Sequence, residues 1–343
     1  MREPGFWWRG AGAAARLLAP AGALYGLVAA HRMAQPGQRA AVPVLCVGNF
    51  TVGGSGKTPT AIAAARILIA AGHRPFFLSR GYGGRLAGPV QVNAQTAADV
   101  GDEPLLLARV APTIVARDRP AGVAAAVQAG ADAVIMDDGW QNPSLAKDLV
   151  IAVLDGRRGI GNGRVFPAGP LRAPLESQLD HADAMLVIGP AGAGAAPAIA
   201  AGQRRRLPRF DGELAAEPAA IAKLAGARVL AFAGIADPGK FFATLEANGI
   251  TVAARQSFPD HHRFTAGEIA GLLAHADRER LALVATEKDL ARFADDPHAG
   301  ELVARTSALP VTLIIRDAAG FGRTVLGAVD PRQAAYQPAK ITP

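Results

Sequence analysis

Short apolar runs alternate with helix-length segments along the first part of the chain. Glycine, proline or polar turn residues bound most of these runs, and the runs show no regular alternation with polar positions. Strands that are apolar on both sides are typical of a parallel sheet covered by helices on both faces. The pattern predicts strands at residues 44–47, 74–79, 113–116, 133–136, 149–154 and 184–188, and helices at 60–71, 105–110 and 120–129.

A second unit of the same kind follows residues 189–202, which are almost all alanine, glycine and proline. That segment is predicted to be a loop or a weak helix near a boundary. Beyond it, apolar runs and a helical pattern alternate again, so we predict a second, smaller α/β domain with a cleft between the two. Its predicted elements are strands at 229–232, 251–253, 281–284 and 311–315 and a helix at 238–247.

An apolar run at residues 17–30 dominates the N-terminal segment. The run is shorter than the roughly 20 residues that a spanning helix needs, and it contains Pro20. A signal peptide would have this length, but Trp7 and Trp8 precede the apolar stretch. We predict a helix that lies on a membrane surface, with the tryptophans at the level of the lipid headgroups. A helix packed on the protein's own core is the alternative.

Composition narrows the classes of partner. Of the 343 residues, 50% are hydrophobic and 19% charged, which indicates a globular protein, and the net charge of +7 favours an anionic partner. Nucleic acid, an anionic membrane and a phosphorylated substrate all qualify. Aromatic residues make up only 6% and form no basic stripe, which argues against single-strand nucleic-acid binding. The single cysteine, Cys46, lies in a predicted strand and excludes a disulfide within the chain.

The turn after the first predicted strand has the layout of a phosphate-binding loop. Its glycines let backbone N–H groups converge on phosphate oxygens, and the next helix adds the positive end of its dipole. Lys57 is predicted to reach the β- and γ-phosphates, and the Thr58 hydroxyl to bind Mg²⁺. Thr51 stands where the general motif has glycine. The residues predicted to bind the nucleotide are Thr51, Val52, Gly53, Gly54, Ser55, Gly56, Lys57 and Thr58.

Two adjacent carboxylates, Asp137 and Asp138, follow the predicted strand at 133–136. A carboxylate at the carboxyl end of a parallel strand is where a protein with a phosphate-binding loop places its Mg²⁺ partner. Neighbouring aspartates point in different directions, so one is predicted to bind the metal and the other to orient it. A solvated turn is the alternative.

The residues alone leave two interpretations for Asp102 and two for the histidines that follow Asp260. Asp102, before Glu103 and a proline, is read from the residues alone as a helix cap, with a general base as the alternative. His261 and His262 follow Asp260, and the lack of further ligands at metal-site spacing argues against structural zinc. A proton-handling role and a surface turn both remain open for the histidines.

Arginines recur in glycine-containing loops, where they suit bidentate contacts with phosphate. Each of these loops is also compatible with a solvated turn. The candidates for substrate or nucleotide phosphates are Arg80, Arg117, Arg119 and Arg172.

Taken in order, these segments resemble the tetraacyldisaccharide 4′-kinase family of lipid A biosynthesis. The resemblance covers most of the chain, and the family tolerates Thr51 in the loop. The matching segments are residues 47–49, 53–59, 79–84, 101–104, 137–141, 161–163, 167–172, 260–261 and 286–289.

The resemblance implies a P-loop NTPase-like kinase that moves the γ-phosphoryl group of MgATP to the 4′-hydroxyl of an acylated glucosamine disaccharide. It also implies a peripheral protein on the cytoplasmic face of the bacterial inner membrane, with no nucleic-acid partner. The family's base and its assisting histidine map onto Asp102 and His261, which reverses the preference for a cap at Asp102. The implied parts are a membrane-surface helix at 1–35, an ATP-binding core at 36–205 and a smaller domain at 206–335.

Two other classes compete with this interpretation. A P-loop ATPase of the partitioning or metal-cluster-carrier type carries an early lysine in its loop, at the position of Val52 here. A nucleotide-binding membrane scaffold without turnover is the second. The family resemblance places both behind the kinase.

Overall fold

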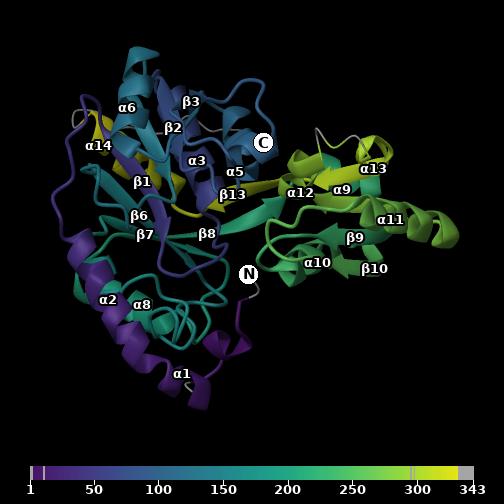
Figure 1. Cartoon of the computed structure of the whole chain (residues 1–343), viewed down its shortest axis with the longest axis horizontal. Coiled ribbons are helices and arrows are strands. Elements are labelled where there is room, and N and C mark those ends of the chain that lie inside the picture. The colour runs from purple at the N-terminus through teal and green to yellow at the C-terminus, as the bar shows by residue number, and fades with distance from the viewer. Residues whose placement is uncertain (1–2, 11, 294–295, 297, 331–343) are drawn as a thin grey trace.

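A nine-stranded mixed sheet with helices on both faces forms the larger part of the protein (Figure 1). The computed structural model describes residues 3–10, 12–293, 296 and 298–330. The strand order is β13-β8-β7-β6-β1-β5-β2-β4-β3, and only the edge strands β13 and β3 run antiparallel to their neighbours. These strands are β1 (Val44–Asn49), β2 (Pro75–Ser79), β3 (Val90–Gln91), β4 (Thr113–Val115), β5 (Ala133–Asp137), β6 (Leu149–Asp155), β7 (Ala184–Ile188), β8 (Arg209–Ala216) and β13 (Val311–Ile315).

The helices of this part divide between the two faces of the sheet. Residues of α2, α6, α7 and α8 pack with one buried cluster, and residues of α3, α5 and α14 pack with the other. We call the nine-stranded sheet with its helices the large lobe. Its helices are η1 (Gly5–Trp8, a 3₁₀ turn), α1 (Ala13–Leu17), α2 (Ala19–Met33), α3 (Lys57–Ala70), α4 (Ala97–Val100), α5 (Asp102–Ala108), α6 (Arg119–Gln128), α7 (Leu175–Leu179), α8 (Ala196–Arg204) and α14 (Ala318–Val329).

A separate four-stranded sheet, all parallel in the order β10-β9-β11-β12, forms what we call the small lobe. Its strands are β9 (Arg228–Ala233), β10 (Thr251–Ser257), β11 (Ala282–Thr286) and β12 (Thr306–Leu309). Its helices are α9 (Pro218–Leu224), α10 (Pro238–Ala247), α11 (Ala266–Glu279), α12 (Glu287–Phe293) and α13 (Gly300–Arg305).

The chain passes from the large lobe to the small one after β8 and returns at β13. The sequence predicted a strand at 311–315 inside the smaller domain, and that placement is wrong: β13 pairs with β8 in the nine-stranded sheet. The predicted domain boundary at 205/206 therefore divides elements that share one sheet. We propose that the small lobe is residues 217–310, because both strands that flank this range belong to the large lobe.

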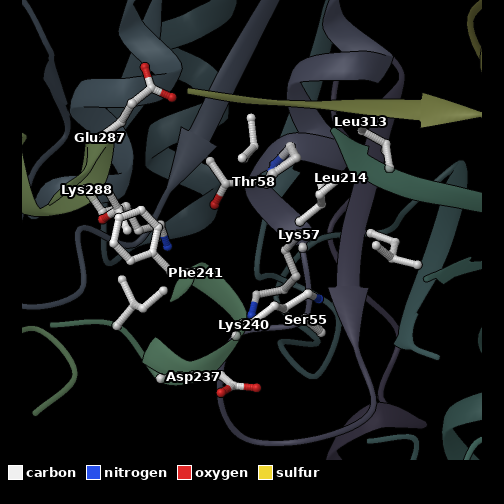
Figure 2. Close-up of a pocket in the computed structure, with 18 of the residues that line it drawn as sticks. Ser55, Lys57, Thr58, Leu214, Asp237, Lys240, Phe241, Glu287, Lys288 and Leu313 are labelled. Carbon is white, nitrogen blue, oxygen red and sulfur yellow. The ribbon is translucent and has the colours of Figure 1, made fainter. Parts of the chain in front are cut away.

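A cavity of about 1880 Å³ lies between the lobes. The phosphate-binding loop and the start of α3 line it from the large lobe, while the starts of α10 and α12 line it from the small lobe. Figure 2 shows Lys57 and Thr58 facing this space together with Lys240, Phe241 and Lys288. The predicted cleft between two α/β units is thus present.

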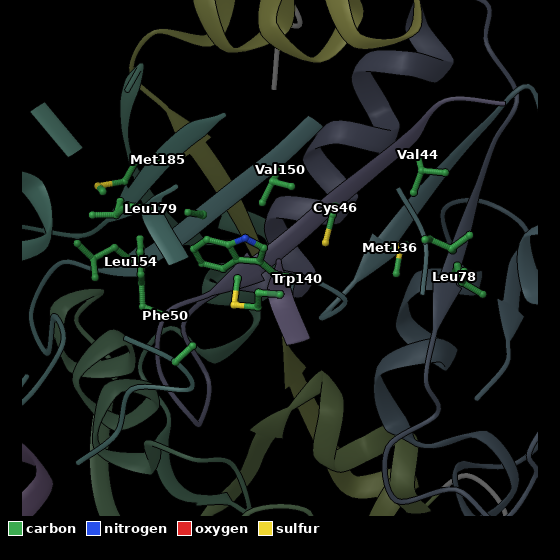
Figure 3. Packing of buried hydrophobic residues seen from close by; sticks show 14 of the residues in the cluster. Val44, Cys46, Phe50, Leu78, Met136, Trp140, Val150, Leu154, Leu179 and Met185 are labelled. Atoms are coloured by element: carbon green, nitrogen blue, oxygen red, sulfur yellow. The ribbon is translucent and has the colours of Figure 1, made fainter. Parts of the chain in front are cut away.

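The apolar runs that predicted the strands are buried on both faces. In β1, Val44 and Cys46 pack into the cluster that contains Trp140 (Figure 3). Leu45 and Val47 pack into the cluster on the opposite face of the sheet. Cys46 is fully buried, as expected for a small core residue. Burial on both faces explains why these strands are continuously apolar instead of alternating.

The N-terminal helix α2 has one buried face of small residues. A Cβ on Gly22 would come within 2.8 Å of the Val165 carbonyl oxygen, so glycine permits close packing on the large lobe. The opposite face carries Leu24 and Leu27, which are 66% and 70% exposed, and Leu17 at the end of α1 is 83% exposed. One face of α2 therefore packs on the protein's core, and the other face exposes leucine side chains.

The tryptophans do not share that exposed face. The predicted position at the headgroup level is wrong for Trp7, which is buried and donates from Nε1 to the Pro167 carbonyl oxygen at 3.0 Å. Trp8 is half-buried and donates from Nε1 to Glu3. Within the described part of the chain, no helix combines the length and apolarity needed to cross a bilayer.

Candidate active site

The phosphate-binding loop connects the end of β1 to the first turn of α3. Gly53 and Gly56 have φ values of +102° and +94°, a region that glycine enters at little cost. The buried Lys57 side chain returns over the loop, with Nζ 3.4 Å from the Gly53 carbonyl oxygen and 3.6 Å from Asp138 Oδ2. The buried Ser55 Oγ has no hydrogen-bond partner. The loop thus combines the Lys57 ammonium group and the unpartnered Ser55 hydroxyl with a backbone conformation that glycine permits.

The first two residues of the predicted nucleotide-binding set contact residues 170–172, and Val52 also lines the cavity. The Val52 N–H donates to the Pro170 carbonyl oxygen at 2.8 Å, and the Thr51 carbonyl accepts from Arg172 Nε at 2.9 Å. These contacts fix the loop against residues 170–172. The donors that remain for phosphate lie from Gly53 onward.

Asp137 lies at the carboxyl end of β5, beside Thr58. The Thr58 hydroxyl donates to Asp137 Oδ2 at 3.2 Å, whereas Oδ1 is buried without a hydrogen-bond partner. Burial, with a contribution from Glu103, raises the pKa of Asp137 to about 7. A buried carboxylate oxygen without a donor, next to a hydroxyl, has the chemistry of a site for a hard cation.

Mg²⁺ fits these residues. No group of three or more histidine, cysteine, aspartate or glutamate side chains suited to a metal occurs among the described residues. Mg²⁺ does not need one, because it is commonly bound by one or two carboxylates together with substrate phosphates and water. Thr58 and Asp137 would supply the protein's share of such a site.

Asp138 points away from Asp137, as the sequence predicted for adjacent aspartates. Its φ of +56° is unusual for a residue other than glycine and turns the side chain toward Arg172. The guanidinium of Arg172 contacts both carboxylate oxygens, at 2.7 and 3.1 Å. Burial would raise the pKa of Asp138, but Arg172 and Lys57 outweigh burial and hold that pKa well below its usual range.

Asp102 and His261 come from different lobes and meet beside the cavity, which His261 lines. Asp102 is the first residue of α5 and is buried, with Oδ2 3.2 Å from His261 Nδ1. Gly101, with φ +87°, takes the N-cap position, so the interpretation of Asp102 as the capping residue is wrong. Tyr82 flanks the imidazole, with the ring centroids 5.0 Å apart.

The charges around this pair favour its ionised form. Burial would raise the pKa of Asp102, but the hydrogen bond from His261 and the charge of Arg292 hold it well below its usual range. Burial would lower the pKa of His261, but Asp102 outweighs burial and raises it. His262, by contrast, contacts Glu268 at 3.0 Å, on the small lobe itself. Of the two histidines, only His261 reaches Asp102.

Sequence reasoning missed Arg292 of α12, and it left open the role of Lys288, which lies in the matching segment 286–289. Arg292 Nε donates to Asp102 Oδ2 at 2.8 Å, and Lys288 Nζ lies 2.7 Å from Glu103 Oε1. The two residues are four positions apart and so share a helix face, a spacing that offered a signal. The segment at 286–289 has a capping role as well, because the Asp289 N–H donates to the Thr286 hydroxyl oxygen at 3.2 Å.

The candidate arginines divide in two. Arg172 lines the cavity beside Lys57, whereas Arg80, Arg117 and Arg119 are not among the residues that line it. Arg119 is buried and donates to the Ala116 carbonyl oxygen at 3.2 Å. Arg117 is exposed and, with Arg119, borders a smaller hollow near the end of α2.

The His261–Asp102 pair predicts a pH-dependent stability. Because the pKa of His261 is raised on folding, its stabilising effect is complete below the unfolded value of about 6.5 and is lost as the pH rises through the folded pKa. Replacing His261 by glutamine should lower Tm by about 2 °C at pH 6 and by less at pH 9, measured by thermal unfolding. A loss of Tm that does not vary with pH would contradict this origin.

Comparisons with known proteins identify the family. The sequence model of the tetraacyldisaccharide-1-P 4′-kinase (LpxK) family matches residues 14–330. A tetraacyldisaccharide 4′-kinase of Rhodopseudomonas palustris (strain BisA53) is 53% identical over 328 residues, covering 95% of each chain. That of Methylobacterium nodulans (strain LMG 21967 / CNCM I-2342 / ORS 2060) is 58% identical over 316 residues, covering 91% of each.

A solved structure shares the fold. The crystal structure of the "apo" form of LpxK from Aquifex aeolicus in complex with ATP aligns with a TM-score of 0.70 and 25% identity. The alignment covers 92% of this chain and 99% of that one. The α/β fold with its P-loop NTPase-like sheet is thereby confirmed, and with the family match and the close relatives the chain belongs to the tetraacyldisaccharide-1-P 4′-kinase family.

Proposed function

We propose that this family member transfers the γ-phosphoryl group of ATP to the 4′-hydroxyl of an acylated glucosamine disaccharide 1-phosphate, a step of lipid A biosynthesis. One observation carries the mechanism. A phosphate-binding loop with a buried lysine and a carboxylate–imidazole pair formed by both lobes lie at the same cavity, which Lys57 and His261 line. The first suits a nucleotide, and the second suits proton transfer from an acceptor hydroxyl.

The large lobe supplies the charges for the transferring group. Lys57 and the N–H groups from Gly53 to Thr58 would bind the β- and γ-phosphates, and Arg172 lies beside them. Thr58 and Asp137 would hold Mg²⁺, which when bound would neutralise charge on the phosphates. Asp138, engaged by Arg172 and near Lys57, would position both cations. Phosphoryl transfer needs mainly positioning and charge stabilisation, and these residues provide both.

The pair at the lobe interface handles the proton. Asp102 is ionised across the working pH range, because its pKa is held low, and so is always ready to accept a hydrogen bond from the hydroxyl. His261 and Arg292 fix its carboxylate through Oδ2. Because His261 and Arg292 belong to the small lobe, closure of the lobes would complete the site and exclude water, which limits ATP hydrolysis.

The direct test is transfer of label from γ-labelled ATP to a detergent-dispersed acylated glucosamine disaccharide 1-phosphate, with and without Mg²⁺. Mg²⁺-dependent label at the 4′-position supports the proposal. ATP hydrolysis that ignores the lipid would refute the acceptor and favour the ATPase class. Nucleotide binding without any turnover would favour the scaffold class.

We also propose that α2 places the enzyme on the cytoplasmic face of the inner membrane as a peripheral protein. The exposed side chains of Leu24 and Leu27 on α2 form an apolar strip. We infer that this strip contacts acyl chains, which both the bilayer and the lipid substrate contain. Exposed Arg9, Arg16 and Arg32 lie along the same segment and suit lipid phosphates.

Charges on the exposed face of α2 should weaken membrane binding. Replacing Leu24 and Leu27 by glutamate removes two apolar side chains from the interface, and partition onto vesicles with anionic phospholipid should fall about 10²-fold in a sedimentation assay. A matched control adds glutamates at exposed apolar positions elsewhere, Ile69 and Val303. Equal losses in both variants would show that net charge, rather than the α2 strip, governs binding.

A further inference from the structure

Glu3, close to the start of the chain, reaches the phosphate-binding loop from outside the sequence motif. A Cβ built on Gly53 would collide with Glu3 Oε1, so the carboxylate lies directly against the loop backbone. Glu3 lines the same cavity as Lys57. A carboxylate therefore lies against the loop, in the cavity that would receive the phosphates of a nucleotide.

Glu3 is held there by one oxygen only. Oε2 accepts from Arg158 Nη1 at 2.8 Å and from Trp8 Nε1 at 3.0 Å. Oε1 is buried and has no hydrogen-bond partner. Burial raises the pKa of Glu3 against the effect of Arg158, which shows that the carboxylate is incompletely compensated. A phosphate, which has more oxygens, could accept more hydrogen bonds from Arg158 and the loop than this carboxylate does.

Arg158 is the cation that a phosphate would find at this place. It lines the cavity, its guanidinium lies 4.7 Å from the centre of the Trp8 ring, and its Nε contacts Asp237 of the small lobe at 3.2 Å. The neighbouring Arg157 also pairs with Asp237 but has no contact with Glu3 among the described residues. Only the second arginine of the pair is thus linked to the loop.

We propose that the Glu3 carboxylate stands in for a nucleotide phosphate, and that ATP binding displaces it and takes over Arg158 as a phosphate ligand. This inference rests on the proposed binding of ATP at the loop. It adds Arg158 to the nucleotide-binding residues and makes the N-terminal segment a competitor of ATP. Replacement of Glu3 by a phosphate is favourable because a triphosphate has several charged oxygens that can accept from the Arg158 guanidinium, whereas Glu3 accepts through Oε2 alone.

Binding of ATP with Mg²⁺ to the full-length protein, measured by calorimetry without lipid acceptor, tests the exchange. Glu3→Gln keeps the side chain's size and removes its charge, so the Kd for ATP should fall by about threefold to tenfold. Arg158→Gln should raise Kd by about tenfold, the usual effect of losing a charge-assisted hydrogen bond. Arg157→Gln, the matched control, should stay within about twofold of wild type.

A second readout reports the displacement itself. Because Trp8 contacts both Glu3 and Arg158, ATP should change the tryptophan emission of the wild-type protein, and Trp8→Phe should remove that change. An unchanged or larger Kd in Glu3→Gln, or an unchanged Kd in Arg158→Gln, would overturn the inference. Wild-type affinity in Lys57→Met would instead refute ATP binding at the loop, so the two failures are distinguishable.

Discussion

Replacing Asp102 by alanine is expected to lower kcat for lipid phosphorylation by about 10²-fold or more, while Kd for ATP stays within about twofold. The carboxylate is the acceptor for the hydroxyl proton, and general-base loss has this magnitude. The nucleotide contacts come from another segment of the large lobe, so ATP binding should be retained. Steady-state transfer of labelled phosphate, combined with calorimetry, separates the two effects.

The control for folding is needed because Asp102→Ala leaves Arg292 buried and without its carboxylate partner. Asp102→Asn keeps the shape and should show the same loss of kcat with a smaller change in Tm. The two histidines give a matched pair: His261→Gln should reduce kcat, whereas His262→Gln, which loses only the contact with Glu268, should not. Near-normal turnover in Asp102→Asn would remove Asp102 from the role of base.

Replacing Lys57 by methionine is expected to lower kcat/KM by about 10³-fold. Methionine has a similar length but no charge, so the loop loses the one cation that it holds over Gly53. Loss of a single preorganised donor to a developing anion costs about 10²- to 10³-fold. Part of the effect should appear as weaker ATP binding, because the same ammonium contacts the phosphates before and during transfer.

Lys57→Met also frees Asp138 from one of its two cations, which leaves Arg172 as its partner. The matched control is Lys223→Met on the exposed surface of α9, which should behave as wild type. A variant at Lys57 with kcat/KM within tenfold of wild type would show that the phosphates bind elsewhere.

The strands that the sequence predicted best are those buried on both faces. β5 and β6 are apolar up to the aspartate that ends each strand, and that pattern depends only on local sequence. β8 was missed because Asp211 and Glu213 interrupt it, and its pairing with β13 is a contact between distant segments. The helix α11 was also missed, although Thr265 and Glu268 form a capping box that was visible in the sequence.

The site residues likewise divide into those that local sequence predicts and those that depend on contacts between distant segments. The phosphate-binding loop and Asp137 lie at the ends of neighbouring strands, so a motif and one topological rule place them together. The contact of Asp102 with His261 and Arg292 joins segments more than a hundred residues apart. The residues alone left a proton-handling role open for His261, and only the family resemblance linked it to Asp102. The contact of Arg292 with Asp102 was not predicted, because long-range pairing depends on how the lobes meet.

The place where the chain leaves and re-enters the large lobe has a consequence for how this architecture arose. Ala216, the last residue of β8, is the direct pairing partner of Val311, the first residue of β13. A tight hairpin turn would span the same gap, so the large sheet would keep its strand order with the intervening segment excised. The small lobe thus occupies the position of a turn between two antiparallel strands. An insertion at such a position leaves the strand order of the large sheet unchanged.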